Sequence, residues 1–338
     1  MGKKRAVILL TQCMILSLAF CGCSTFVPLS ERAIVKGIYL DESNGMVQSA
    51  LVVYTCAPSA NTAEARSEAR IYTGEGATIE QALKTAEKKQ NKKPFYAQNR
   101  LLLLGPHTFD SASDYLLYFG AEEVSRANLS VFLTDTTREE FSQLEEKVSV
   151  VVEESERLMQ KNKGKGSKVC GVHEIRYDEN EHFYGYLPIL QIHANEFTGV
   201  EELMLYDSGT PLCTLRDLAM QLTLLLSGKA QSLETTQSIE KTQTTLRTQQ
   251  LFLQREIDDN GVLFIQLCGK TESLTQNGRA LQGDSARQTL QQYNALIDEA
   301  AQQLIHLTTQ RGNDVFACGW WAEGALKGVR IQSRIRMA

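Results

Sequence analysis

The sequence predicts a multi-domain α+β protein, in which mixed sheets are built from hairpins and packed helices. The chain has 338 residues, more than a single hydrophobic core usually serves. Two hairpins are predicted over residues 32–55 and 202–213, because each consists of two apolar runs joined by a short polar turn that contains glycine. Amphipathic helical segments are mixed with these strands without forming regular βαβ repeats, which favours the α+β class.

The chain begins with a segment that has the three-part build of a secretory signal. Three basic residues precede an apolar run over 6–20, which is too short to span a bilayer comfortably, and Gly22 and Cys23 follow it. A cysteine at this place is typical of bacterial lipoprotein signals. We therefore expect residues 1–22 to be removed and Cys23 to carry a diacylglycerol and an N-acyl chain. The alternatives are an ordinary secretory peptide cut nearby and an uncleaved N-terminal anchor.

The first predicted domain covers residues 23–197. After its opening hairpin we expect, in order, an exposed loop or frayed helix over 58–70, a turn at 74–76, a helix over 78–91 that starts with a capping box, a strand over 101–104, a helix over 111–124, a strand over 128–134, a long charged helix over 136–161 and a strand over 183–193. The four leucines at 101–104 are consistent with a strand buried on both faces. Pro188 indicates that the last strand lies at a sheet edge or forms a bulge.

The second predicted domain covers residues 198–338 and can divide into two subdomains. Its expected elements are the hairpin at 202–213, a helix over 218–226, strands over 250–257 and 262–269, a helix over 285–310 and a final strand with alternating apolar residues between Val329 and Ile335. Residues 235–248 are rich in Thr and Gln and show no strong periodicity, so no element is predicted there.

Composition and motifs exclude several classes of function. The formal net charge is −5, which argues against nucleic-acid binding as a main activity. The five cysteines beyond Cys23 are widely spaced and odd in number, so we expect free, mainly buried thiols. Cys170 and His173 have a spacing that zinc could use, but no second close pair accompanies them. Asp284 and Ser285 are better explained as a helix start than as a nucleophile site. We expect no metal, no other cofactor and no enzymatic activity.

Several motifs along the chain point to one known family. Besides the lipoprotein signal ending at Cys23, these are AIVKGI at 33–38, GEGATIEQAL at 74–83, FYAQNR at 95–100, LYD at 205–207, LLLSGK at 224–229 and DVFACG at 314–319. Together they resemble the Ger(x)C lipoprotein family, which comprises the C subunits of spore germinant receptors. The resemblance covers nearly the whole chain, although its motifs are structural patterns and not chemical signatures.

The resemblance implies a role without catalysis. The family's C subunits are lipoproteins on the outer face of the spore inner membrane, where they act with two integral membrane subunits, of A and B type, in nutrient-triggered germination. The family fold has three domains of mixed sheet and helix. By this resemblance we expect the chain to be a noncatalytic, membrane-tethered receptor subunit that acts by binding partners.

A polar and aromatic cluster is the candidate contact with a partner. Tyr96, Gln98 and Arg100 could form this patch, because Tyr and Arg are favoured at interfaces. The alternative is structural, with Tyr96 covering the core and Arg100 paired with a nearby acid. Two other functions are alternatives. A solute-binding lipoprotein of a transporter would need repeated βαβ units around a cleft, and a lipid-anchored hydrolase would need a catalytic constellation.

Overall fold

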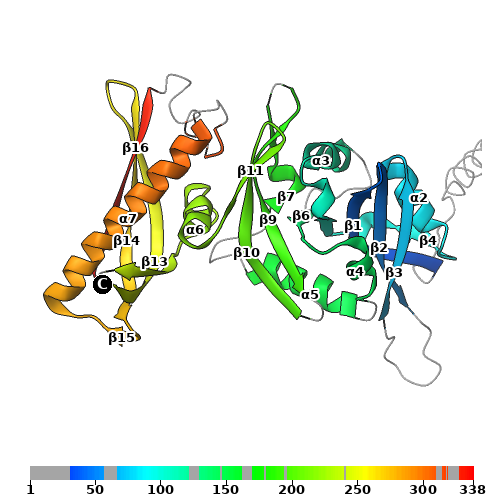
Figure 1. Ribbon diagram of the computed structural model, residues 1–338, viewed down its shortest axis with the longest axis horizontal. Coiled ribbons are helices and arrows are strands. Elements are labelled where there is room, and N and C mark those ends of the chain that lie inside the picture. The colour runs from blue at the N-terminus through cyan, green and yellow to red at the C-terminus, as the bar shows by residue number, and fades with distance from the viewer. Residues whose placement is uncertain are drawn as a thin grey trace, which may run out of the picture.

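The computed structural model describes residues 31–56, 67–121, 129–144, 147–161, 170–178, 180–193, 196–239, 241–309, 314–316, 318 and 327–338. Figure 1 shows an elongated molecule with one sheet towards each end and a short helix between the two sheets. Hairpins, mixed sheets and packed helices confirm the predicted multi-domain α+β class. The signal segment and Cys23 lie outside the described residues, so their predictions remain predictions.

The first sheet combines a parallel centre with antiparallel flanks. Its strands run in the order β11-β10-β9-β6-β5-β1-β2-β3, and three short strands pair alongside. Their bounds are β1 (Arg32–Ser43), β2 (Met46–Cys56), β3 (Ser67–Gly76), β4 (Lys93–Phe95), β5 (Leu101–Leu104), β6 (Ser130–Leu133), β7 (Cys170–Gly171), β8 (Arg176–Tyr177), β9 (Phe183–His193), β10 (Glu196–Asp207) and β11 (Thr210–Leu215). Strand β5 pairs in parallel with β1 and β6, and β6 with β9.

Helices cover both faces of this sheet, and the alternation of side chains along β5 explains why. Leu101 and Leu103 belong to one core cluster, with residues of α4 (Arg138–Ser142) and α5 (Val148–Lys161). Leu102 and Leu104 belong to the other cluster, with residues of α2 (Ile79–Glu87) and α3 (Ala112–Ala121). All four leucines are fully buried, which confirms a strand covered on both faces.

The segment 67–76 differs from its prediction. Residues 74–76 were expected to turn and residues 67–70 to form part of a loop, but all of them belong to strand β3. The two glycines are needed for close packing and not for a turn. A Cβ on Gly74 would collide with the carbonyl oxygen of Ala82 and stand 2.5 Å from the nitrogen of Ala86, so α2 lies directly on the strand.

Two further predictions need correction. The long helix expected over 136–161 is two helices, α4 and α5; Thr137 and Glu140 form a capping box at the start of α4. For strand β9 the prediction gave two alternatives, and the edge position is wrong, because β10 and β11 lie beyond it. The other alternative, a bulge, agrees with the pairing, since Pro188 lies opposite Leu203, next to a register shift between Val200 and Glu202 of β10.

The second hairpin extends the first sheet and does not open a new one. Strands β10 and β11 pair with each other, and β10 pairs with β9. The boundary predicted between residues 197 and 198 therefore falls inside β10. The second sheet starts only at β12, after helix α6 (Asp217–Leu226), which packs against β10 on one side and against elements of the second sheet on the other.

The second sheet is covered by a long helix. It contains β12 (Glu234–Ile239), β13 (Thr242–Ile257), β14 (Val262–Gln276), β15 (Arg279–Ala280) and β16 (Gly328–Arg336), with α7 (Gly283–Thr309) across it. Residues 235–248, for which no element was predicted, form β12 and the start of β13. Their alternation is hidden because several inward positions are threonines, such as the buried Thr244 and Thr248.

Helix α7 also closes one edge of the second sheet. The backbone N–H of Ile335 in β16 donates to Asn294 Oδ1 at 3.2 Å, and the N–H of Ser333 donates to Asp298 Oδ1. Both donors would otherwise be available to another strand. Over the described residues, no helix has the length and apolar character needed to cross a bilayer.

The burial of β5 yields a stability prediction. Leu102→Ala removes a fully buried side chain and should lower the free energy of unfolding by about 2–5 kcal/mol. Leu296→Ala is the control, because Leu296 on α7 is 37% exposed, and it should cost much less. Urea unfolding followed by circular dichroism measures both variants. An equal decrease in the free energy of unfolding for the two variants would contradict the conclusion that β5 is buried on both faces of the sheet.

Candidate functional site

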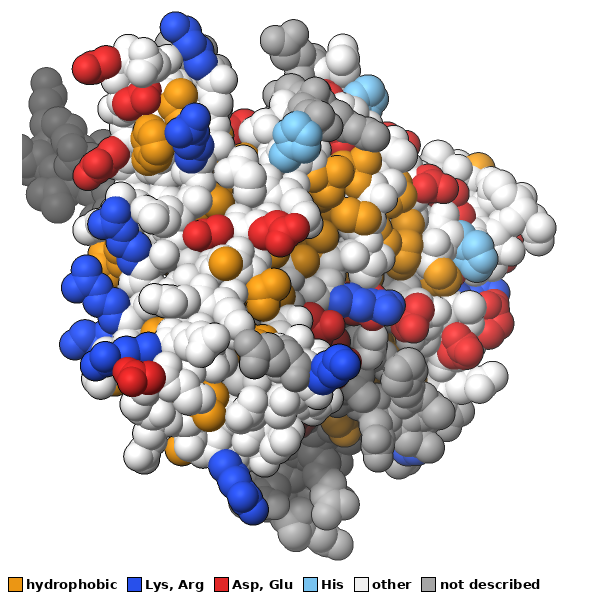
Figure 2. Space-filling model, turned by 60° about the vertical axis from the view of Figure 1, so that its left-hand side comes forward, with side chains coloured by type: hydrophobic (Ala, Val, Ile, Leu, Met, Phe, Trp, Pro, Cys, Tyr) orange, Lys and Arg blue, Asp and Glu red, His pale blue; other side chains and the backbone are white. Residues whose placement is uncertain are grey.

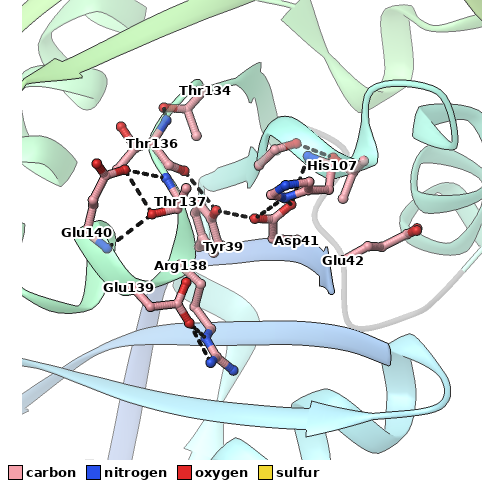
Figure 3. Close-up of polar contacts among 12 residues, drawn as sticks. Tyr39, Asp41, Glu42, His107, Thr134, Thr136, Thr137, Arg138, Glu139 and Glu140 are labelled. Atoms are coloured by element: carbon pink, nitrogen blue, oxygen red, sulfur yellow. Dashed lines mark hydrogen bonds and ion pairs between the residues drawn. The ribbon is translucent and has the colours of Figure 1, made fainter. Parts of the chain in front are cut away.

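The carboxyl ends of the parallel strands carry a buried polar cluster. Ligands of sheets with parallel strands commonly bind at such ends. Here β1, β5 and β6 end side by side, and they or the turns after them supply Tyr39, Asp41, His107 and Thr136 (Figure 3). We call these four residues the Asp41 cluster. It was not anticipated from the sequence.

Asp41 is the centre of the cluster and is only 2% exposed. Its Oδ1 accepts from the backbone N–H of His107 at 3.0 Å, and both of its oxygens lie 3.2 Å from His107 Nδ1. The Tyr39 hydroxyl lies 3.1 Å from Asp41 Oδ2 and 2.8 Å from the carbonyl oxygen of Thr136, and it donates to this pair of acceptors. The buried carboxylate thus contacts Tyr39 of β1 and His107 after β5, and the Tyr39 hydroxyl extends the network to Thr136 after β6.

The electrostatics of the cluster favour a structural role. Burial first, and then the Asp41 carboxylate, raise the pKa of Tyr39 well above its usual range. The phenol therefore stays protonated at any physiological pH and remains a hydrogen-bond donor. The aromatic ring of Tyr39 stacks on Phe141 of α4, with ring centroids 4.8 Å apart. Only His107, whose side chain is 61% exposed, reaches the solvent.

Gly105 shows how little free space the cluster contains. Its N–H donates to the Leu40 carbonyl at 2.7 Å, which holds the end of β5 against β1. A Cβ at this position would collide with the Tyr39 hydroxyl and would stand 2.6 Å from Asp41 Cγ. The carboxyl ends of the strands are therefore filled by the protein's own side chains.

A second set of hydrogen-bonded polar side chains, centred on Glu42, lies beside the Asp41 cluster. Glu42 Oε1 accepts from the hydroxyls of Ser111 and Tyr115 at 2.8 Å each, which ties the end of β1 to the start of α3. Burial and this hydrogen bond raise the pKa of Tyr115. At the start of α4, the backbone N–H of Thr137 donates to the Glu140 carboxylate in the capping box. This hydrogen bond lowers the pKa of Glu140.

The predicted partner-contact residues follow one another around a short helical turn. Tyr96 and Gln98 lie on the 3₁₀ turn η2 (Tyr96–Gln98), and Arg100 follows it. The Tyr96 hydroxyl donates to Glu87 Oε1 at 2.5 Å, and its ring packs against the core cluster beneath α2. Gln98 and Arg100 are half-buried, and the structure shows no ion pair between Arg100 and another described residue. Tyr96 thus supports the fold, while a partner contact stays a prediction.

Four cysteines, Cys170, Cys213, Cys268 and Cys318, have free thiols. Cys170 and Cys318 are buried, whereas Cys213 and Cys268 are half-buried. Burial raises the pKa of the Cys170 thiol to about 11 and that of Cys318 to about 12, so both stay protonated and unreactive at neutral pH. Within the described ranges, no group of three or more His, Cys, Asp or Glu side chains could hold a metal ion.

A cavity of about 870 Å³ lies between the first sheet and the second unit. Its walls come from β7 to β9, the end of α6, β13 and residues 314–316. Lys229 Nζ contacts Glu174 Oε2 at 2.6 Å and lies 5.8 Å from the ring centroid of Tyr186. Burial alone would lower the pKa of Lys229, but Tyr186, Cys170 and Glu174 raise it overall, so the ammonium stays charged.

Residues from both units meet at the mouth of this cavity. Arg255 of β13 donates to the carbonyl of Leu226 at 3.3 Å, and Arg176 of β8 donates to the carbonyl of Asp314 at 3.3 Å. The cavity lining thus includes two acidic residues, Glu174 and Asp314, and three basic ones, Arg176, Lys229 and Arg255. Sequence reasoning missed this cavity because its residues come from five separate segments that no local pattern connects.

The packing around Gly105 can be tested directly. Gly105→Ala should lower the free energy of unfolding by about 1–3 kcal/mol, because the new methyl group enters occupied space next to Asp41 and Tyr39. Gly328→Ala is a matched control, since a Cβ there meets nothing within 4 Å. Chemical denaturation measures both variants. If Gly105→Ala is as harmless as the control, the cluster is less closely packed than described.

Comparison with known proteins identifies the family. Residues 26–192 match the family model described as the spore germination protein N-terminal domain. Among solved structures, the crystal structure of the GerBC protein is similar to the chain, with a TM-score of 0.48 and 13% sequence identity, over 93% of this chain and 99% of that chain. No curated protein matches the chain. Through the match at residues 26–192, the chain belongs to the Ger(x)C family of spore germination proteins.

Proposed function

We propose that the chain is a noncatalytic, lipid-anchored subunit of a nutrient germinant receptor. The match of residues 26–192 to the spore germination domain is the observation that carries this proposal. On this reading the protein is held at the outer face of the spore inner membrane by acyl chains on Cys23. It acts there by contacting integral membrane subunits of A and B type.

The chemistry of the described residues supports a binding role over catalysis. The Asp41 cluster is filled by its own side chains, and Tyr39 stays protonated within it. Cys170, the thiol that lines the cavity, has a raised pKa and is not an activated nucleophile. A tethered protein also needs only a weak interface, because the anchor raises its local concentration at the membrane.

The solute-binding alternative has one observation in its favour, which is the cavity between the two units. The architecture supports it less. A solute-binding protein would have two similar lobes of repeated βαβ units, whereas here an 11-stranded sheet faces a five-stranded sheet covered by one long helix. We therefore retain the receptor subunit as the proposed function.

The receptor role is tested with spores that lack this chain. Dipicolinate release should fall when nutrients are the trigger and stay normal when a germinant that bypasses the receptors is used. Parallel receptors are deleted in the same strain so that they cannot mask the loss. An unchanged nutrient response in that background would contradict the receptor role and favour the solute-binding alternative.

The anchor is tested with Cys23→Ser. The variant should leave the membrane fraction and give the same nutrient defect as the deletion, because it has no acceptor for the lipid. Cys213→Ser, which changes a half-buried cysteine of the folded part, should stay in the membrane fraction. A membrane-bound, lipid-free Cys23→Ser protein would instead favour an uncleaved N-terminal anchor.

The partner contact is tested with the double variant Gln98→Ala and Arg100→Glu. Tyr96 is left intact because its bond to Glu87 supports the fold. The variant should co-purify with the integral membrane subunits at least several-fold less well than the unchanged chain. Arg279→Glu, an exposed change on β15, is the control and should not weaken co-purification. Equal recovery of both variants would remove these two residues from the interface.

A further inference from the structure

The second sheet has one face that the described elements leave open. Helix α7 packs against the face that contains Leu263, Ile265 and Leu267 of β14 and Ile335 of β16. Side chains alternate along a strand, so the residues between these positions point the opposite way. Those residues are half-buried or exposed, and no described helix packs over them.

The open face carries a concentration of positive charge. Where β14 and β16 pair, Phe264 lies opposite Arg330, Cys268 opposite Arg334 and Lys270 opposite Arg336, with a pair of glutamines between the first two. The paired segment presents four cations on its open side. Two acidic residues border them, because Glu256 of β13 pairs opposite Phe264 and Glu272 follows Lys270 by two positions on β14. The cations still outnumber the acids, and Lys270, Arg334 and Arg336 form the most positive end of the face. The chain as a whole is negative, with a formal net charge of −5, so the local sign is reversed.

Aromatic side chains accompany these cations. Phe252 of β13 pairs opposite Cys268 and is 52% exposed. The Arg330 guanidinium lies 5.9 Å from the ring centroid of Phe264. In Figure 2, Lys and Arg side chains gather along the left edge of the view, with hydrophobic and some acidic side chains among them. Exposed aromatic residues among cations suit the boundary between lipid headgroups and acyl chains.

The tether places a membrane within reach of the molecule. Eight peptide units separate Cys23 from Glu31, where the described chain begins, and they can span at most about 28 Å. Figure 1 places β1 towards one end of the long axis and the second sheet at the other end. A contact made by the second sheet would therefore lie far from the anchor and would align the long axis with the bilayer.

We propose that the open face of β14 and β16 binds the anionic headgroups of the membrane to which the chain is tethered. The contact is electrostatic, since the four cations complement the negative surface potential of a bilayer with anionic lipids. Each cation near such a surface strengthens binding by about fivefold at low salt. This inference rests on the proposed membrane tether but concerns a different part of the chain.

The test uses the full chain reconstituted on bilayers of phosphatidylcholine, with or without phosphatidylglycerol. Acetylation of Lys270, followed by mass spectrometry, reports whether the open face is covered. The reaction should slow several-fold on the anionic bilayer only, and 1 M salt should restore it because the screening length falls to about 3 Å. Equal rates on both bilayers would overturn the proposal.

Charge reversal provides matched variants. Arg334→Glu with Arg336→Glu should abolish the difference between the two bilayers, because the remaining contact is weaker by at least about 25-fold. Arg279→Glu with Arg287→Glu changes the net charge equally, at exposed positions on β15 and α7, and should keep the difference. If both double variants change the protection of Lys270 equally, the net charge of the chain explains the effect, and the proposed binding by the open face is refuted.

Flotation of the chain with the vesicles separates the anchor from the face. If the chain floats with both kinds of vesicle but Lys270 is not protected from acetylation, the result supports the lipid anchor and overturns this inference. Flotation on anionic bilayers only, with Lys270 protected, would support the face and count against the tether. Protection that appears only when the integral membrane subunits are added would assign the face to a protein partner and refute lipid binding.

Discussion

The buried carboxylate of Asp41 is the constraint on which the first sheet depends. A charge inside a protein must be satisfied by hydrogen bonds, and the donors here come from different segments. His107 follows β5, and the Tyr39 hydroxyl joins Asp41 to the backbone of Thr136, which follows β6. Because Gly105 leaves no unoccupied space, these strand ends are held in one arrangement. In other proteins with parallel strands, the carboxyl ends of the strands often bind ligands. Here the side chains of the Asp41 cluster fill this place and hold the strand ends together.

Local patterns in the sequence predicted local structure well. The hairpin at Asn44 and Gly45 follows from residues that tolerate positive φ, and Thr78 does accept from the Gln81 amide at the start of α2. Predictions failed where a residue's role depends on a distant segment. Gly74 looks like a turn residue until α2 is placed on top of it.

The candidate sites could not have been found from the sequence for the same physical reason. Asp41 and His107 are 66 positions apart, and no local pattern connects them. The cavity between the units joins Glu174 to Lys229 across 55 positions. The match to the family model ends at residue 192, although the first sheet continues through β10 and β11. Sequence families and hydrogen-bonded sheets therefore divide this chain at different places.

The parallel centre of the first sheet has a consequence for how the chain folds. Hairpins such as β1–β2 and β10–β11 join neighbouring segments and can form within microseconds. Pairing Gly37 with Leu101, and Leu133 with Ile189, requires long loops to close first, which slows folding. Until β5 and β6 enter, the flanking hairpins expose unpaired strand edges that can join other chains. Aggregation during refolding should therefore compete mainly with the insertion of these two short strands.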